Sequence, residues 1–132
     1  MIALDSSALV SVAIEEEGFE QFEHTISSHR CVVGAPTLQE IYMVLCGKPD
    51  IDPVIFIERT LSLPTISVVA FTRSHFDVSR LAFDLFGRGR GHPAKLNFGD
   101  CLSYAVAKVA DVPLLFRGKD FDQTDIRAAL LS

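Results

Sequence analysis

Short apolar runs alternate with longer segments of helical periodicity along the whole chain. Four runs rich in Val, Ile and Leu predict strands, and they cover residues 2–4, 31–33, 66–71 and 112–116. Between these runs, apolar side chains recur every three or four residues, which is typical of helices with one buried face. The helices are expected near residues 8–13, 19–26, 36–46, 53–61, 72–86, 100–109 and 122–131.

The alternation of short strands with helices predicts an α/β fold. Connections through helices favour parallel pairing, and continuously apolar strands favour a sheet that is covered on both faces. We therefore expect a single domain over residues 1–132, with three layers: a parallel sheet of about four to five strands flanked by helices on both faces. A chain of 132 residues is long enough to bury a substantial core.

The composition is that of a globular protein, with 48% apolar and 22% charged residues. The apolar runs are too short to span a bilayer, and Asp5 interrupts the first of them, so we expect a soluble, cytoplasmic protein. The three cysteines, Cys31, Cys46 and Cys101, lie in apolar stretches without C-x-x-C spacing. They are expected to be buried, reduced thiols.

The net charge of −5 at first argues against a nucleic-acid partner, but the charge is unevenly distributed. Residues 1–30 hold six acidic residues and one arginine, whereas residues 73–95 hold five Lys or Arg and only two Asp. Within the second segment, residues 87–93 read Gly-Arg-Gly-Arg-Gly-His-Pro, which predicts a flexible basic loop. A locally basic region on an acidic body leaves contact with nucleic acid open.

Four acidic residues, Asp5, Glu40, Asp100 and Asp120, lie at or near junctions between a predicted strand and a predicted helix. In an open parallel sheet such junctions converge on one edge, where ligands bind. Carboxylates gathered there would repel one another and resist ionisation unless a cation shared them. The pattern therefore favours a site for Mg²⁺ or Mn²⁺, the ions used in phosphate chemistry.

Simpler interpretations exist for two of the four acids, and the identity of a third is open. Asp5 precedes two serines and Asp100 opens a helical segment, so either could serve only as a helix N-cap. Asp120 competes with Asp122 and Asp125 for the fourth position in the acidic site.

Glu40 is harder to explain as an ordinary surface residue. It shares a helix face with Met43 and Val44 and has no evident basic partner in the sequence, so a role as a ligand is favoured.

Four ordered motifs of the chain resemble those of PIN-domain ribonucleases, most closely the VapC-type toxins of bacterial toxin–antitoxin pairs. They are Ile2-Ala3-Leu4-Asp5-Ser6-Ser7-Ala8-Leu9, Pro36-Thr37-Leu38-Gln39-Glu40, Leu96-Asn97-Phe98-Gly99-Asp100-Cys101 and Leu114-Leu115-Phe116-Arg117-Gly118-Lys119-Asp120-Phe121. Many relatives carry Thr-x-Asp or Thr-x-Asn after the last strand, where this chain has Phe116-Arg117-Gly118. Asp120 is therefore the substitute proposed for the fourth acid.

The resemblance implies a metal-dependent endoribonuclease that is held inactive by a small VapB-like antitoxin. It assigns metal binding and catalysis to Asp5, Glu40 and Asp100, with Asp120 as the fourth acid, and Mg²⁺ or Mn²⁺ as the cofactor. A homodimer and a toxin–antitoxin hetero-oligomer are expected, with no membrane partner. The apolar residues Phe19 and Phe22 are assigned either to the core or to a groove for the antitoxin.

Residues beside the acidic motifs have supporting roles in this interpretation. Ser6 either orients a carboxylate, acts through water, or caps the first helix. The side chains expected to contact the RNA backbone are those of Arg117, Lys119, Arg88, Arg90 and Lys95.

Two other classes of protein compete with a nuclease. A receiver-type phosphoacceptor switch shares the parallel α/β fold, and Lys119 follows the last strand as such a switch requires. However, the third strand ends in Val69-Ala70-Phe71-Thr72 without an aspartate. A non-catalytic PIN-like binding module would keep the fold without the chemistry, and the three well-matched acids argue against it.

Overall fold

The computed structural model describes residues 1–130, whose strands form one four-stranded sheet. The strands are β1 (Ile2–Leu4), β2 (Cys31–Gly34), β3 (Ile66–Val69) and β4 (Leu114–Leu115). They lie in the order β3-β2-β1-β4, and every neighbouring pair is parallel. The expected parallel α/β architecture is confirmed.

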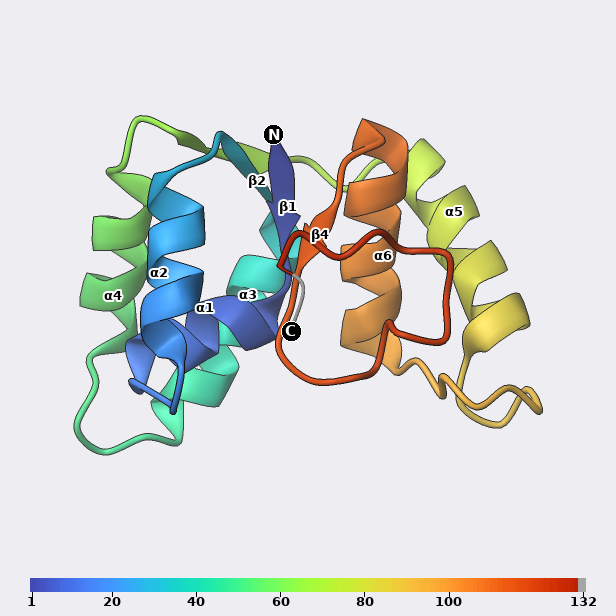
Figure 1. Cartoon of the computed structure of the whole chain (residues 1–132), viewed down its shortest axis with the longest axis horizontal. Coiled ribbons are helices and arrows are strands. Elements are labelled where there is room, and N and C mark those ends of the chain that lie inside the picture. The colour runs from blue at the N-terminus through green and yellow to red at the C-terminus, as the bar shows by residue number, and fades with distance from the viewer. Residues whose placement is uncertain (131–132) are drawn as a thin grey trace.

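Helices cover both faces of this sheet, as Figure 1 shows. On one side lie α1, α2 and α4, and on the other lie α5 and α6. None of the helices in the described part of the chain has the length and apolarity needed to cross a membrane. The helices are α1 (Ser6–Ala13), α2 (Phe19–Ser27), α3 (Ala35–Cys46), α4 (Pro53–Leu61), α5 (Arg73–Phe86) and α6 (Phe98–Ala110).

The central strands are apolar throughout because successive side chains enter two different cores. Ile2 and Leu4 of β1 pack with residues of α1, α2 and α3, whereas Ala3 between them packs with α5 and α6. In β2, Val33 packs in the same core as Ile2 and Leu4, and Val32 packs in the same core as Ala3. A sheet that is covered on both faces thus accounts for the continuous apolar runs in the sequence.

Polar side chains at helix starts fix where the chain leaves the sheet. Asp5 is the N-cap of α1, and its carboxylate accepts a hydrogen bond from the backbone N–H of Ser7. At the start of α6, Asn97 and Asp100 form a reciprocal capping box. Two of the acids expected at a metal site are therefore also capping residues. The simpler interpretation of each is correct, and it does not exclude a role in metal binding.

The prediction of a helix over residues 122–131 is wrong for residues 122–130. Residue 131 lies outside the residues that the structure describes. Residues 120–123 form turns instead. The Thr124 hydroxyl donates to the Phe121 carbonyl and accepts from the Ile126 N–H, and such side-chain bonds compete with helix formation. The chain then pairs with β4, because the N–H of Leu114 donates to the Arg127 carbonyl at 2.9 Å.

The glycine-rich basic segment is more ordered than expected. The N–H of Arg88 donates to the Leu96 carbonyl and that of Leu96 to the Phe86 carbonyl, both at 2.9 Å. Ala94 and Leu96 are buried in the core on the α5–α6 side. The segment is thus a closed loop with buried contacts, which place it at the start of α6 (Figure 1).

The cysteines are only partly as expected. Cys31 and Cys101 are buried, and burial raises the pKa of each thiol to about 11. Cys46 is exposed, because it is the last residue of α3 and lies outside the face that packs on the sheet. The expectation of burial was therefore wrong for Cys46.

Candidate functional site

Asp5 lies directly after the central strand β1, with 4% of its surface exposed. Its Oδ2 accepts hydrogen bonds from the backbone N–H of Ser7 at 3.1 Å and from the Ser7 hydroxyl at 2.5 Å. Its Oδ1 is buried and has no hydrogen-bond partner in the structure. A buried carboxylate oxygen without a partner is costly, so this atom is suited to a ligand.

Ser7 connects Asp5 to the neighbouring strand β4. The Ser7 hydroxyl oxygen accepts a hydrogen bond from the backbone N–H of Arg117 at 2.9 Å. The N–H of Asp5 donates to the Leu115 carbonyl at 3.0 Å. These bonds fix the Asp5 carboxylate relative to the carboxyl ends of both strands. Sequence reasoning missed Ser7, although a serine two residues after a capping aspartate is a recognisable signal for such a contact.

Asp100 lies in the first turn of α6 and is 9% exposed. Its Oδ2 accepts from the backbone N–H of Asn97 at 3.0 Å, and the Asp100 N–H donates to the Asn97 Oδ1 at 2.8 Å. The capping box fixes this carboxylate at the start of the helix. Asn97 is a second residue whose role was missed, although Asn-x-x-Asp before an apolar segment is a capping signature.

Glu40 of α3 places its carboxylate against the backbone of Gly99 in the first turn of α6. A Cβ atom at position 99 would overlap the Glu40 Oε2, so only glycine leaves room for this approach. The Oε1 of Glu40 is buried and has no hydrogen-bond partner. The amino end of α6 carries a partial positive charge, which favours a carboxylate there.

The pKa of Asp100 is raised from 3.8 to about 6. Burial is the largest cause, and the negative charges of Asp5, Asp120 and Glu40 add to it. The backbone hydrogen bond from Asn97 partly offsets these effects. The structure therefore brings the four expected acids close enough together to perturb one of them.

The pKa of Glu40 is also raised, first by burial and then by the charge of Asp5. The Ser6 hydroxyl faces Glu40 and favours its charged form, which lowers this pKa in part. Ser6 thus lies beside the Glu40 carboxylate, as its expected role of orienting a carboxylate requires. The cap of α1 is formed by Asp5 and Ser7 instead.

Asp120 differs from the other three acids because it lies in an exposed loop after β4. Its charge contributes to the raised pKa of Asp100, whereas its two competitors face elsewhere. Asp125 pairs with Lys108 at 2.7 Å, and Asp122 lines a hollow that also contains Phe22. Of these three aspartates, Asp120 is the one whose charge acts on Asp100, which favours it as the fourth acid.

These oxygen donors match the ligand preference of Mg²⁺, but the arrangement is open. Within residues 1–130, no three Asp, Glu, His or Cys side chains are grouped closely enough to hold one metal ion directly. Mg²⁺ commonly uses one or two carboxylates and keeps several waters, so such an open set is compatible with it. The unpartnered Asp5 Oδ1 and Glu40 Oε1 supply two oxygens of the required kind.

The side chain of Arg117, which was expected to contact RNA, is bound to other residues of the chain. Its Nη1 donates to the Ser11 hydroxyl at 3.0 Å and to the Glu17 carbonyl at 2.8 Å, and its Nε pairs with Glu16 at 3.1 Å. A phosphate contact by this guanidinium would require these bonds to break. The side chain instead joins the loop after β4 to the end of α1.

The remaining expected RNA contacts are exposed. Lys119 is adjacent to Asp120, and Arg88, Arg90 and Lys95 lie on the loop before α6. Arg90 lies over the ring of Phe83, 5.7 Å from its centroid. Arg88, Arg90 and Lys95 thus belong to the segment that leads into α6, and Lys119 belongs to the loop that carries Asp120.

Comparison with known proteins now identifies the class. The PIN domain family model matches residues 2–127. The chain is 37% identical to ribonuclease VapC42 of Mycobacterium tuberculosis over 129 residues, which cover 96% of this chain and 97% of that protein. It is 33% identical to ribonuclease VapC30 of the same species over 131 residues, or 98% of this chain and 99% of that protein.

Solved structures show the same fold. The crystal structure of M. tuberculosis VapC20, described as a sarcin-ricin loop cleaving toxin, matches with a TM-score of 0.73 at 14% identity and covers 96% of each chain. A toxin–antitoxin complex from Klebsiella pneumoniae matches with a TM-score of 0.67 at 15% identity, covering 95% of this chain and 93% of that one. The chain therefore belongs to the PIN domain family and, within it, to the VapC ribonucleases. The resemblance inferred from the four sequence motifs is confirmed.

Proposed function

We propose that this protein is a metal-dependent endoribonuclease, the toxin of a type II toxin–antitoxin pair. The observation that carries the proposal is the cluster at the start of α6. There, two buried carboxylate oxygens of Asp5 and Glu40 have no partner, beside an Asp100 whose pKa is raised to about 6. The names of the curated VapC relatives support ribonuclease activity.

We assign the principal ion, Mg²⁺ or Mn²⁺, to Asp5 and Asp100. Both are buried and fixed by hydrogen bonds, to Ser7 and Asn97 respectively. Glu40 and Asp120 complete the site, directly or through ordered water. A bound divalent ion would polarise the scissile phosphate and favour ionisation of the attacking water.

The chain's own residues have distinct tasks in this reaction. Ser7 holds Oδ2 of Asp5 and so keeps Oδ1 directed toward the ligand. Where Glu40 reaches the ion through water and not directly, its raised pKa and unpartnered Oε1 suit it to accept a proton from that water. Ser6 favours the charged form of Glu40, which is the form that accepts a proton.

RNA binding is assigned to Lys119, Arg88, Arg90 and Lys95. Phosphate contacts supply affinity without reading the base sequence, so these side chains grip any strand presented to the acids. They also offset the repulsion between RNA and a body of net charge −5. Arg117 serves indirectly, by fixing the loop that carries Lys119 and Asp120.

We propose that a VapB-like antitoxin binds the apolar groove between α1, α2 and α4. Leu9, Val12, Ile26, Phe56 and Leu63 line this groove, which suits the apolar face of a peptide helix. The Klebsiella structure of similar fold is a toxin–antitoxin complex, which supports a partner of this kind.

The two phenylalanines that were assigned either to the core or to an antitoxin groove are not among the residues that line this groove, and they differ in burial. Phe22 is 7% exposed and belongs to the core, whereas Phe19 is half-buried.

Self-association is assigned to a second apolar surface. Met43 and Val44 of α3 are 64% and 41% exposed, and Phe98 at the start of α6 is 81% exposed. Together with Pro36 and Leu102 they line a hollow that also contains Glu40. A homodimer through this surface would place two acidic sites near each other. The cytoplasmic location expected from the sequence stays a prediction.

The test is cleavage of RNA by purified protein in Mg²⁺ or Mn²⁺, with and without a chelator. Cleavage that stops on chelation and returns with added metal supports the proposal. Absence of cleavage by a folded, metal-supplied protein favours a non-catalytic binding module. Incorporation of label from a phosphoryl donor as an acid-stable, base-labile acyl phosphate would instead point to a receiver-type switch.

A further inference from the structure

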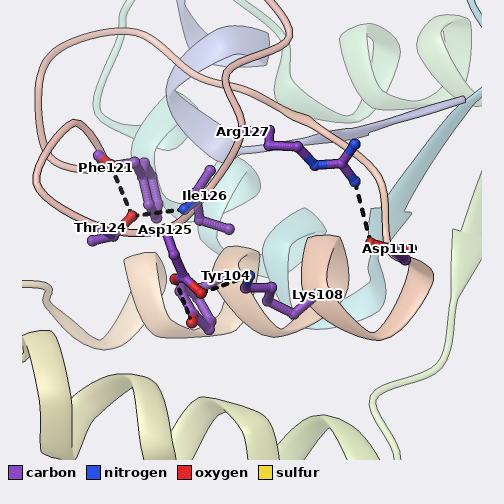
Figure 2. Close-up of polar contacts among 8 residues, drawn as sticks. All are labelled: Tyr104, Lys108, Asp111, Phe121, Thr124, Asp125, Ile126 and Arg127. Atoms are coloured by element: carbon purple, nitrogen blue, oxygen red, sulfur yellow. Dashed lines mark hydrogen bonds and ion pairs between the residues drawn. The ribbon is translucent and has the colours of Figure 1, made fainter.

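The segment that follows Asp120 lies along α6 and contacts it at successive turns (Figure 2). Asp125 reaches Tyr104 and Lys108, and further along Arg127 reaches Asp111, the residue that ends the helix. The order of contacts along the segment follows the order along the helix. The segment is therefore docked on α6 in a defined register.

The contact at Asp125 has the best geometry of this series. The Tyr104 hydroxyl donates to Asp125 Oδ1 at 2.7 Å, and Lys108 Nζ pairs with Oδ2 at 2.7 Å. Burial raises the pKa of Asp125, but the hydrogen bonds from Lys108 and Tyr104 outweigh it, and the net pKa lies below the usual value. Both carboxylate oxygens thus have charge-favoured partners on one helix.

The partners of Asp125 lie on the same face of α6 as a candidate metal ligand. Asp100, Tyr104 and Lys108 are spaced four residues apart, and residues at this spacing share a helix face. Asp125 binds the second and third of these positions, and Asp120 lies five residues before it in the same segment. One helix face thus carries both the acidic site and the contact that holds the loop.

The chain between Asp120 and Asp125 is short and tightly folded. Phe121 is 2% exposed within the α5–α6 core, and the Thr124 hydroxyl bonds to its carbonyl at 2.8 Å. A turn closed in this way transmits the position of Asp125 to Asp120, which makes no hydrogen bond of its own in the described residues.

We propose that Asp125 is a positioning residue which, by binding Tyr104 and Lys108, sets where Asp120 lies relative to Asp100. This inference rests on the proposed function, since it gives Asp120 a place in the metal site. The residue itself does not touch metal or RNA. It acts by fixing which residues of α6 the segment after Asp120 contacts.

A purely structural role would give a different result from a positioning role. The side chains of Lys108 and Asp125 are 36% and 56% exposed, and ion pairs at this exposure contribute little to stability. Loss of the pair should therefore leave the fold intact. A positioning role makes a further prediction: metal binding should weaken by more than any change in stability explains.

The test compares Asp125→Asn with Asp77→Asn in the full chain. Asp77 pairs with Arg73 at 3.0 Å on α5, and its side chain is 50% exposed, so its loss removes an ion pair of similar exposure on a different helix. The readouts are the melting temperature, the Mn²⁺ affinity by calorimetric titration, and the Mn²⁺ dependence of RNA cleavage.

We expect Asp125→Asn to weaken Mn²⁺ binding about tenfold, the lower end of the effect of residues that orient metal ligands. The Mn²⁺ concentration needed for half-maximal cleavage should rise while the rate at saturating Mn²⁺ changes little. Asp77→Asn should match the wild type in both. Equal Mn²⁺ affinity for Asp125→Asn and the wild type would overturn the inference.

A charge exchange supplies a second test. Lys108→Glu alone should loosen the segment, and the double variant Lys108→Glu/Asp125→Lys should recover part of the lost Mn²⁺ affinity, because the ion pair is restored in reverse. Hydrogen exchange of the amides of residues 118–124 should rise in Asp125→Asn and fall again in the double variant. Unchanged exchange in Asp125→Asn contradicts the inference.

These results separate the inference from the proposed function. If the wild type neither binds Mn²⁺ nor cleaves RNA, the nuclease proposal fails, and with it the role of Asp125 in metal binding. If the wild type does both and Asp125→Asn behaves as Asp77→Asn does, the positioning role fails while the nuclease proposal stands.

Discussion

Two parts of the acidic site are held in place by different means. Asp5 and Asp100 are buried at the ends of regular elements, and each receives hydrogen bonds from a neighbour two or three residues away. Asp120 is exposed on a loop whose position depends on contacts made by flanking residues. The first kind of placement is local in the sequence, and the second depends on the folded chain. Substitutions should therefore affect the two parts to different extents.

Asp100→Asn should have the largest effect. We expect cleavage to fall by more than about a hundredfold, because even residues that only orient metal ligands contribute about 10–100-fold. The backbone hydrogen bond from Asn97 can be kept by the new amide oxygen, so the protein should remain folded. The measurement is RNA cleavage at saturating Mn²⁺, with circular dichroism as the check on folding. Turnover at the wild-type rate would remove Asp100 from the site.

The metal-free protein should lose stability as the pH rises. The pKa of Asp100 is about 6 in the folded state and 3.8 in the unfolded chain. Between pH 3.8 and pH 6, the folded protein therefore holds a proton that the unfolded chain has released. This contribution is complete below about pH 4 and is lost as the pH passes through 6. Its size is about 3 kcal/mol at most.

Urea unfolding in chelator between pH 4 and pH 7.5 measures this loss, with Asp100→Asn as the matched variant. The variant should show a flatter dependence over the same range. A steeper fall in the variant than in the wild type would show that other groups cause the effect.

Gly99→Ala should separate activity from stability. The added methyl group overlaps the Glu40 carboxylate, which is the end of a flexible side chain and can move aside at little cost in folding free energy. Cleavage should nevertheless fall about 10–100-fold, as for a displaced metal-site residue. Gly89→Ala is the control, because a Cβ there meets nothing within 4 Å, although its positive φ adds some strain. A melting temperature that falls far more for Gly99→Ala than for Gly89→Ala would contradict the proposed displacement of Glu40.

Asp120→Asn should have the smallest effect on cleavage of the three substitutions, about tenfold. An exposed carboxylate acts on the ion through solvent, so its loss is less severe than that of a buried ligand. The pKa of Asp100 should fall slightly, since one of the charges that raises it is gone. The measurement is a Mn²⁺ titration of cleavage at several pH values. A loss as large as that of Asp100→Asn would place Asp120 in direct contact with the ion.

Most elements up to β4 could be predicted from the sequence because their apolar residues recur with a single period, although β3 and β4 are shorter than predicted. The helix over Pro53–Leu61 was placed at its observed bounds, since a proline marks its start and the apolar spacing stops at its end. The C-terminal segment could not be predicted in this way. Thr124 and its neighbours favour turns, and pairing with β4 depends on contacts between distant parts of the chain.

The acidic site shows the same division. Asp5, Glu40 and Asp100 were predicted from their positions at element junctions, and the structure brings them together. Their assignment as metal ligands stays a proposal until an ion is measured at the site. The direction of the Arg117 side chain was not predictable, because its partners at residues 11, 16 and 17 are about a hundred positions away in the sequence.

Gly99 carries no functional group, yet it shapes the site by what it lacks. Every other amino acid begins with the same Cβ atom, so the clash with Glu40 does not depend on the size, charge or polarity of the rest of the side chain. Position 99 should therefore tolerate no substitution in a screen for toxicity, including the most conservative ones. Intolerance of this kind is usually attributed to catalytic chemistry, whereas here it would arise from the space reserved for another residue.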